Sequence, residues 1–201
     1  MNLTYRAAQS FSYTYFRLFH RLKIQGLENI PKVNAFILAC NHLSFFDPPA
    51  IGCRIPRNLH YFARDSLFHG PMGFLIRNLN SIPVNRKQLD IRTLRVVLKV
   101  LAGGEPILLF PEGTRSESGS LQKAQSGLGF LAFKSGVPIV PARIIGSDKA
   151  LGKGMIFPRV GQKISLKIGK MFVPNVFPSE FSNAQKYEEI SKLAMSRIEN
   201  L

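Results

Sequence analysis

The chain has 201 residues, of which 45% are hydrophobic, a balance that is typical of one globular domain with a full core. Lys and Arg number 27 against 12 Asp and Glu, and the net charge of +15 indicates an anionic partner such as a nucleic acid, a membrane surface or a phosphorylated substrate. The two cysteines exclude a disulfide framework and lack metal-ligand spacing. We expect neither a signal peptide nor a membrane span, since a span needs about 20 mostly apolar residues.

Residues 1–24 have the periodicity of an amphipathic helix. Its apolar face comprises Thr4, Ala8, Phe11, Tyr15, Leu18 and Leu22, and the opposite face comprises Arg6, Ser10, Arg17 and Arg21, with Tyr13 and His20 nearby. A terminal helix that is both aromatic and basic is typical of a segment lying in a membrane interface. We therefore predict a membrane-docking helix at 1–24 and one domain at 25–201. The alternative is a helix that packs on this domain as part of its core.

The rest of the chain alternates between strand-like and helix-like segments. Strands are predicted at 35–40, 59–62, 81–84, 106–110, 139–145 and 163–168. Helices are predicted at 49–54, 71–78, 87–101, 128–134 and 184–198. This alternation predicts a single α/β domain whose central mixed, mostly parallel sheet is flanked by helices. Ligands of such sheets bind at the carboxyl ends of strands, where residues 41–47 and 110–116 would lie.

The pattern His-x4-Asp occurs twice. His42 and Asp47 follow the predicted strand 35–40, and the prolines after Asp47 favour a short helix that this aspartate caps, which would turn its carboxylate back towards the imidazole. A carboxylate that accepts a hydrogen bond from one imidazole nitrogen leaves the other nitrogen as a base. In the second pair, His60 lies inside a strand-like run and Asp65 opens the next segment. The first pair is therefore the better catalytic candidate.

The loop after the predicted strand 106–110 has the composition of a phosphate site. Gly113 lets backbone amides approach a ligand, Thr114 and Ser116 supply hydroxyls, and Arg115 offers a planar fork of donors. Glu112 would repel a phosphate unless it is engaged, so it either orients Arg115 or meets a substrate hydroxyl. A polar turn with a surface arginine is the structural alternative.

Other candidate sites are weaker. Cys40 and Ser44 are possible nucleophiles, but the chain has no Gly-x-Ser-x-Gly elbow, and Cys40 at a strand end is typical of a core residue. The glycines at 127 and 129 mimic a dinucleotide fingerprint without the preceding strand, which favours the start of a helix that packs closely. No group of residues has the spacing of a metal site.

Taken together, these motifs resemble the glycerolipid acyltransferases typified by 1-acylglycerol-3-phosphate acyltransferase. The family's Asn-His-x4-Asp motif is similar to residues 41–47, and its Phe-Pro-Glu-Gly-Thr-Arg-Ser motif is identical to residues 110–116. Residues 82–86 (Ile-Pro-Val-Asn-Arg), 137–141 (Val-Pro-Ile-Val-Pro) and the lead-in at 24–31 also resemble family segments. The resemblance covers roughly residues 20–170.

The resemblance implies the transfer of an acyl group from a thioester to the free sn-2 hydroxyl of lysophosphatidic acid. His42 would be the general base and Asp47 its partner, with no acyl-enzyme. Arg115, helped by Arg86 and Arg64, would hold the acceptor's phosphate beside Glu112, Gly113 and Thr114. Another lysophospholipid is the alternative acceptor. A basic nucleic-acid-binding module would explain the charge but leaves the two motifs unexplained.

The implied partners are the lipid acceptor, an anionic membrane surface and an acyl donor on coenzyme A or acyl carrier protein. We expect no metal, no resident cofactor and no nucleic acid. Two free thiols are typical of a reducing compartment, so the expected location is the cytoplasmic face of a membrane, peripheral or monotopic.

Overall fold

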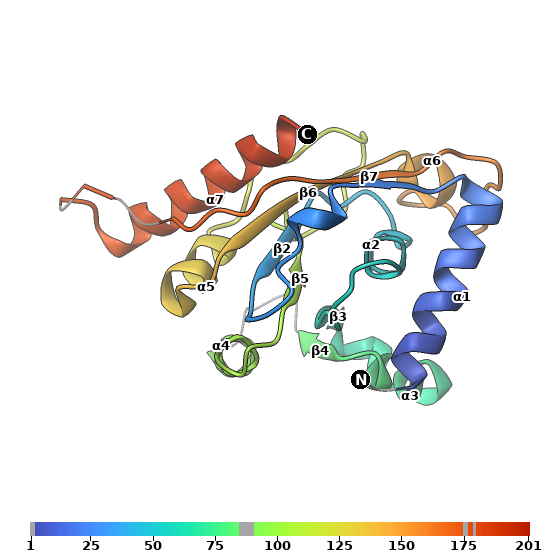
Figure 1. The fold of residues 1–201 in the computed structure, drawn as a ribbon, viewed down its shortest axis with the longest axis horizontal. Helices are drawn as coiled ribbons and strands as arrows, with labels where there is room; N and C mark the ends of the chain where they lie inside the picture. Colours follow the sequence, from blue (N-terminus) through green and yellow to red (C-terminus); the bar gives the residue numbers. More distant parts are fainter. Residues whose placement is uncertain (1–2, 85–90, 175–176, 179) are drawn as a thin grey trace.

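The central sheet has the strand order β1-β7-β6-β2-β5 in a computed structural model that describes residues 3–84, 91–174, 177–178 and 180–201 (Figure 1). The strands are β1 (Lys23–Gln25), β7 (Ser165–Ile168), β6 (Ile139–Ile145), β2 (Ile37–Cys40) and β5 (Ile107–Leu109). The β1–β7, β6–β2 and β2–β5 pairs are parallel, whereas β6 and β7 are antiparallel. The predicted mixed, mostly parallel sheet is therefore confirmed.

The segment that contains β2 is buried on both faces of this sheet. Because successive side chains of a strand point to opposite faces, alternate residues enter different parts of the core. Phe36, Leu38 and Cys40 enter one apolar cluster, and Ala35, Ile37 and Ala39 enter the other. Helices on both faces, together with the neighbouring strands and loops, supply the rest of each cluster.

Two layers of helices cover the sheet. On one face lie α1 (Leu3–His20) and α2 (Asp47–Gly52), and on the other lie α4 (Ile91–Ala102), α5 (Gly127–Ser135) and α7 (Asn183–Glu199) (Figure 1). The predicted final helix is confirmed, and a capping box at Ser182 and Gln185 starts it. The sequence analysis did not predict α6 (Ser147–Leu151), a short helix after β6. The predicted start of α4 at residue 87 lies outside the described residues.

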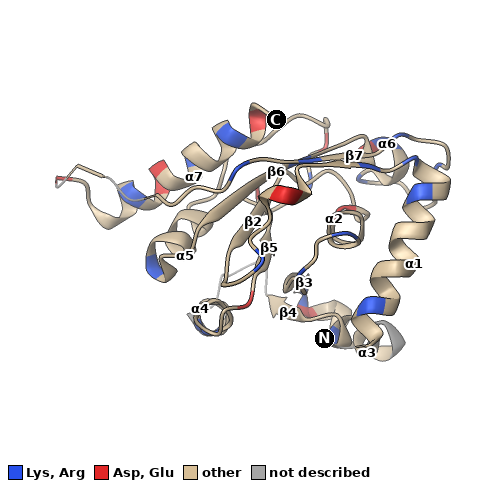
Figure 2. Cartoon of the chain, viewed as in Figure 1, with Lys and Arg blue, Asp and Glu red and all other residues tan. Residues whose placement is uncertain are grey.

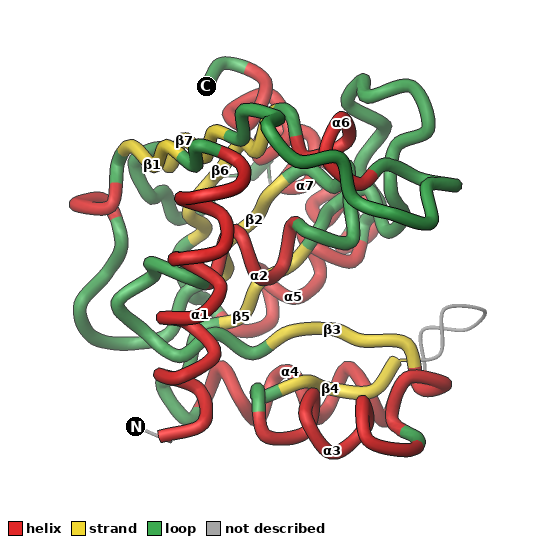
Figure 3. Tube along the Cα trace, turned by 90° about the vertical axis from the view of Figure 1, so that its right-hand side faces the viewer, coloured by secondary structure: helices red, strands yellow, loops and turns green. Residues whose placement is uncertain are grey.

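A second, smaller sheet adjoins the edge of the central one. Its strands β3 (Tyr61–Arg64) and β4 (Ser81–Val84) are parallel and are connected through the 3-10 helix η2 (Asp65–Phe68) and helix α3 (Gly70–Asn78) (Figure 3). His60 forms a bridge with Ile107 of β5, and its carbonyl accepts a hydrogen bond of 2.9 Å from the Leu108 amide. The bridge ties the smaller sheet to β5.

Helix α1 ends earlier than predicted. It stops at His20, because Arg21 adopts a left-handed conformation with φ of 46° and Leu22 turns into the core. Residues 23–25 then pair with β7 as strand β1, so the prediction of a helix continuing to residue 24 is wrong. Hydropathy did not indicate this strand, since its exposed ends resemble a polar turn of helix.

The buried face of α1 also differs from the predicted apolar face. Tyr5, Phe16 and His20 are buried, although His20 was assigned to the polar side. Polar contacts hold this face in place: the Tyr5 hydroxyl hydrogen-bonds with Tyr61 at 2.8 Å, and the Gln9 amide donates to two carbonyls near α2. A hydropathy wheel misses such contacts. Within the described residues, no helix has the length and apolar character needed to cross a bilayer.

Candidate active site

Two loops meet at the carboxyl edge of the central sheet. One follows β2 and the other follows β5, and these strands are parallel neighbours, so both chains leave the sheet at the same edge. Hydrogen bonds join the loops at His42. Its amide donates to the Glu112 carboxylate at 3.0 Å, and its carbonyl accepts from the Ser116 amide at 2.8 Å. The backbone of the candidate base is therefore held by the second loop.

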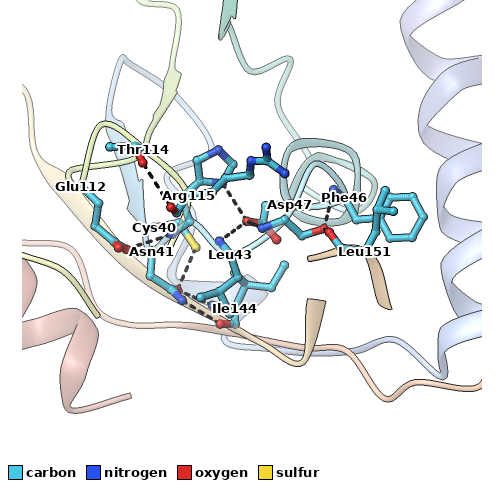
Figure 4. A network of polar contacts seen from close by, with 12 residues as sticks. Cys40, Asn41, Leu43, Phe46, Asp47, Glu112, Thr114, Arg115, Ile144 and Leu151 are labelled. Carbon is cyan, nitrogen blue, oxygen red and sulfur yellow. Dashed lines mark hydrogen bonds and ion pairs between the residues drawn. The ribbon is translucent and has the colours of Figure 1, made fainter. Parts of the chain in front are cut away.

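The side chain of His42 contacts a buried carboxylate. Its Nδ1 lies 2.8 Å from Asp47 Oδ2, which also accepts hydrogen bonds from the Leu43 and Ser44 amides at 2.6 and 2.7 Å (Figure 4). The carboxylate thus turns back to the imidazole as predicted. The predicted cap is wrong, however, because Phe46 is the N-cap of α2 and Asp47 already lies in the first turn. The side chain of Asp47 therefore serves the preceding loop instead of its own helix.

The imidazole of His42 is fixed from a second side. The Phe110 ring stacks on it, with centroids 3.9 Å apart and planes inclined by 12°. Because a carboxylate only accepts hydrogen bonds, Nδ1 is the protonated nitrogen and Nε2 carries the lone pair. His42 is 7% exposed, so its imidazole lies in a largely buried setting next to the edge of the sheet.

Glu112 has a role that the sequence pattern did not indicate. It is 1% exposed, and its two carboxylate oxygens accept hydrogen bonds from the backbone amides of His42 and Gln122 at 3.0 and 3.2 Å. Burial raises the pKa of this carboxyl above its usual value, and the two amide hydrogen bonds counteract part of that rise. The carboxylate thereby links the β2 loop to the β5 loop.

Asn41 extends the sheet by one step with its side chain. Its amide nitrogen donates to the Ile144 carbonyl at 2.9 Å, and its amide oxygen accepts from the Ile144 nitrogen at 2.7 Å (Figure 4). These bonds continue the β2–β6 pairing past Cys40 and Ala142. The sequence did not indicate this contact, because Ile144 lies 103 positions away from Asn41.

The loop after β5 lines a surface cavity of about 360 Å³, and one of the lining residues, Ser116, donates its amide to the His42 carbonyl. The Arg115 guanidinium lies over the half-exposed ring of Phe45, 3.6 Å from its centroid. Lys153, which the sequence analysis missed, reaches the cavity from the loop after α6 and forms an ion pair with Glu117. The lining residues are Thr114, Arg115, Ser116, Glu117, Ser118, Gln122 and Lys153. Gly113 makes the turn above them with φ of 72°.

The remaining basic candidates lie elsewhere or outside the described part of the chain. Arg64 is exposed at the end of β3 in the smaller sheet, and Arg86 falls among residues that the structure does not describe. In the second His-x4-Asp pair, His60 bridges to β5, and the Asp65 carboxylate accepts from the Ser66 amide at 2.8 Å. His60 and Asp65 therefore each contact the backbone of a different neighbour and support the local fold.

The alternative nucleophiles have structural roles. Cys40 is fully buried, and this burial raises the pKa of its thiol well above the usual value. The Ser44 hydroxyl donates to the Leu151 carbonyl and accepts from the Phe46 amide. Among the described residues, no three His, Cys, Asp or Glu side chains gather as a metal site would require.

Of the two glycines at the start of α5, Gly129 is a packing feature, as predicted, whereas a Cβ atom on Gly127 would meet no atom within 4 Å. A Cβ atom on Gly129 would lie 1.8 Å from the Tyr187 carbonyl oxygen of α7, so only glycine allows the two helices to approach this closely. The similarity to a dinucleotide fingerprint is therefore accidental.

Comparisons with known proteins identify the family of this chain. Residues 21–145 match the family model described as Acyltransferase. The chain is 32% identical to the 1-acyl-sn-glycerol-3-phosphate acyltransferase of Bacillus subtilis, over 66% of this chain and 67% of that protein. It is 29% identical to 1-acyl-sn-glycerol-3-phosphate acyltransferase BAT2 of Brassica napus, over 68% of this chain, and spans 40% of that longer relative.

A solved structure has the same fold. The 1-acyl-sn-glycerophosphate acyltransferase PlsC from Thermotoga maritima is 29% identical and superposes with a TM-score of 0.78. The match covers 98% of this chain and 80% of that one.

Proposed function

Because the chain belongs to the Acyltransferase family, we propose that it transfers a fatty acyl group from a thioester to the free sn-2 hydroxyl of lysophosphatidic acid, giving phosphatidic acid. The observation that carries this proposal is the hydrogen-bonded pair of His42 and Asp47, which the hydrogen bond from the Ser116 amide to the His42 carbonyl joins to the wall of the cavity that contains Arg115. A base and an anion-binding group at one edge are what the acylation of a phosphorylated alcohol needs.

The reaction follows from the geometry of the imidazole. His42 Nε2 removes the proton from the acceptor's hydroxyl as the oxygen attacks the thioester carbonyl carbon. Asp47 keeps the proton on Nδ1 and stabilises the imidazolium that forms. The tetrahedral intermediate then collapses, the carbon–sulfur bond breaks, and the leaving thiolate takes the proton from His42. A thioester is already activated, so the mechanism needs no acyl-enzyme.

The cavity beside this pair is the proposed site of the acceptor's phosphate. Arg115 supplies the planar fork, and Thr114, the Gly113 turn and Lys153 complete a site of hydroxyl, amide and cationic donors. Arg64, which does not line this cavity, and Arg86, which lies outside the described residues, are proposed to bind the same phosphate on family resemblance alone. Glu112 then acts by positioning His42, since its carboxylate is occupied by backbone amides.

The proposed donor is acyl-coenzyme A or acyl-acyl carrier protein, both anionic carriers that suit a net charge of +15. The mechanism uses no metal and no resident cofactor. The lipid acceptor places the protein at a membrane surface, and we assign it a peripheral position on the cytoplasmic face. Helix α1 presents exposed Leu3 and Phe11, and an exposed Arg6, for contact with anionic lipid.

The experiment is a product analysis by mass spectrometry. Purified protein receives a mixture of lysophospholipids with each type of donor, and His42→Ala and His60→Ala serve as a matched pair. We expect phosphatidic acid as the main product, a loss of several orders of magnitude in His42→Ala, and near-normal turnover in His60→Ala. Normal turnover in folded His42→Ala refutes the mechanism, and a different dominant product identifies another lysophospholipid as the acceptor.

A further inference from the structure

A second group of exposed apolar side chains lies outside the candidate site, in the loop of residues 152–163 between α6 and β7. Ile156, Phe157 and Val160 are 84, 79 and 62% exposed. The loop contains no acidic residue and carries three exposed cations, Lys153, Arg159 and Lys163. Large solvent-exposed apolar side chains among charges of one sign indicate an interaction surface. We call this segment the basic–apolar loop.

The two ends of the basic–apolar loop are anchored at different parts of the molecule. At its start, Lys153 pairs with Glu117 in the wall of the proposed phosphate cavity. At its end, the Gly161 amide donates to the Phe19 carbonyl at 2.7 Å, and the Ile164 amide donates to the His20 carbonyl at 3.0 Å. The loop therefore runs from the cavity to the last turn of α1, and its apolar residues lie between the two anchors.

The last turn of α1 also exposes apolar side chains next to basic ones. Leu18 and Phe19 are 69 and 48% exposed, and both Arg17 and Arg21 are exposed. Figure 1 shows α6, after which the loop begins, next to this end of α1, and Figure 2 shows basic residues in the same region. The loop and the helix end together give one surface with apolar side chains among cations.

We propose that the basic–apolar loop and the last turn of α1 form a surface that binds an anionic lipid bilayer. The apolar side chains enter the headgroup boundary, and the surrounding Lys and Arg meet lipid phosphates, because an excess of cations complements a negatively charged membrane. The proposal rests on the proposed function, since a lipid acceptor requires access to a membrane. Lys153 belongs to both the basic–apolar loop and the wall of the phosphate cavity, so the docking surface is continuous with the cavity. An acceptor can then move from the bilayer to the cavity along the protein.

The test is partition to vesicles of phosphatidylcholine with and without phosphatidylglycerol. The variant is the pair Ile156→Ser and Phe157→Ser, and the matched control is Val33→Ser, which removes a 70% exposed apolar side chain before β2, at the amino edge of the sheet. We expect the pair to lower the partition coefficient on anionic vesicles by at least about tenfold, while the control changes it by less than about twofold. Arg159→Gln should weaken partition only where phosphatidylglycerol is present.

A second measurement separates this proposal from the proposed function. Acyl transfer to a monomeric short-chain acceptor should stay near the wild-type rate in the Ile156→Ser, Phe157→Ser pair, because neither residue lines the cavity. Unchanged vesicle partition in the pair overturns the docking surface even if the enzyme is active. A wild-type dimer that the pair converts to monomer, with vesicle binding unchanged, assigns the surface to a second copy and also overturns it. Vesicle partition needs no catalysis, so a wild-type protein that binds anionic vesicles without transferring acyl groups contradicts only the proposed function.

Discussion

Replacing Asp47 by asparagine separates the charge of this residue from its shape. Asp47 Oδ2 accepts hydrogen bonds from the His42 ring at 2.8 Å and from the Leu43 and Ser44 amides at 2.6 and 2.7 Å. The amide oxygen of an asparagine in the same position accepts these bonds without a charge. We therefore expect Asp47→Asn to fold with the loop in place and to lose acyl transfer.

The three hydrogen bonds set the scale of the effect. A bond to a charged group is worth about 1.5–3 kcal/mol and a neutral bond about 0.5–1.5 kcal/mol, so three of them weaken by about 3–4 kcal/mol in total. This sum is an upper bound on the loss of unfolding free energy, because removing a buried charge also removes its desolvation cost. The catalytic loss is larger: once His42 holds a proton, it faces a neutral amide, and we expect kcat to fall by about 10²–10⁴-fold.

The assay follows thiol release from the donor with a short-chain acceptor, and urea unfolding measures stability. Asp65→Asn is the matched control, because it makes the same change in the second His-x4-Asp pair, where an exposed carboxylate accepts from the Ser66 amide. The control should keep both rate and stability. A folded Asp47→Asn variant with kcat within about tenfold of the wild type would refute the assignment of Asp47.

Three further predictions concern the cavity and the thiols. Arg115→Lys keeps a charge but loses the planar fork, so the acceptor's KM should rise and the donor's KM should change little; the reverse would assign Arg115 to the donor site. Glu117→Gln removes the exposed ion pair of Lys153, so the acceptor's KM should fall by about twofold to fivefold in steady-state kinetics. An unchanged KM would exclude Lys153 from the phosphate site. Burial raises the pKa of the Cys53 thiol to about 12 and that of the Cys40 thiol well above its usual value, so N-ethylmaleimide should label neither thiol until urea unfolds the protein; rapid labelling of the native protein would contradict this burial.

The strands and the paired loops could be predicted because they depend on local patterns. Residues 139–145 and 81–84 alternate or remain apolar over the length of a strand, and both strands have the predicted bounds. The position of His42 and Asp47 followed from a strand end and two prolines. Their contact needed only local chain reversal, which sequence spacing describes well.

The features that were missed depend on contacts between distant residues. Glu112 contacts the His42 amide, 70 positions away, and Asn41 pairs with Ile144, 103 positions away. Lys153 reaches the cavity only because the loop after α6 returns to the β5 loop. The buried face of α1 depends on Tyr61, Gly52 and other partners whose positions a helical wheel does not contain.

The division of hydrogen bonds between Asn41 and His42 has a consequence for strand alignment. Asn41 is tied to β6 through its side chain, whereas His42 is tied through its backbone to the loop that leaves β5. The candidate base is therefore located by two neighbouring strands at once. A slip of either strand by one residue displaces one tie by about 3.3 Å, which is more than a hydrogen bond tolerates. His42 keeps its hydrogen bonds to Glu112 and Ser116 only when both strands are in their native alignment, so only a correctly assembled sheet places its imidazole next to the loop after β5.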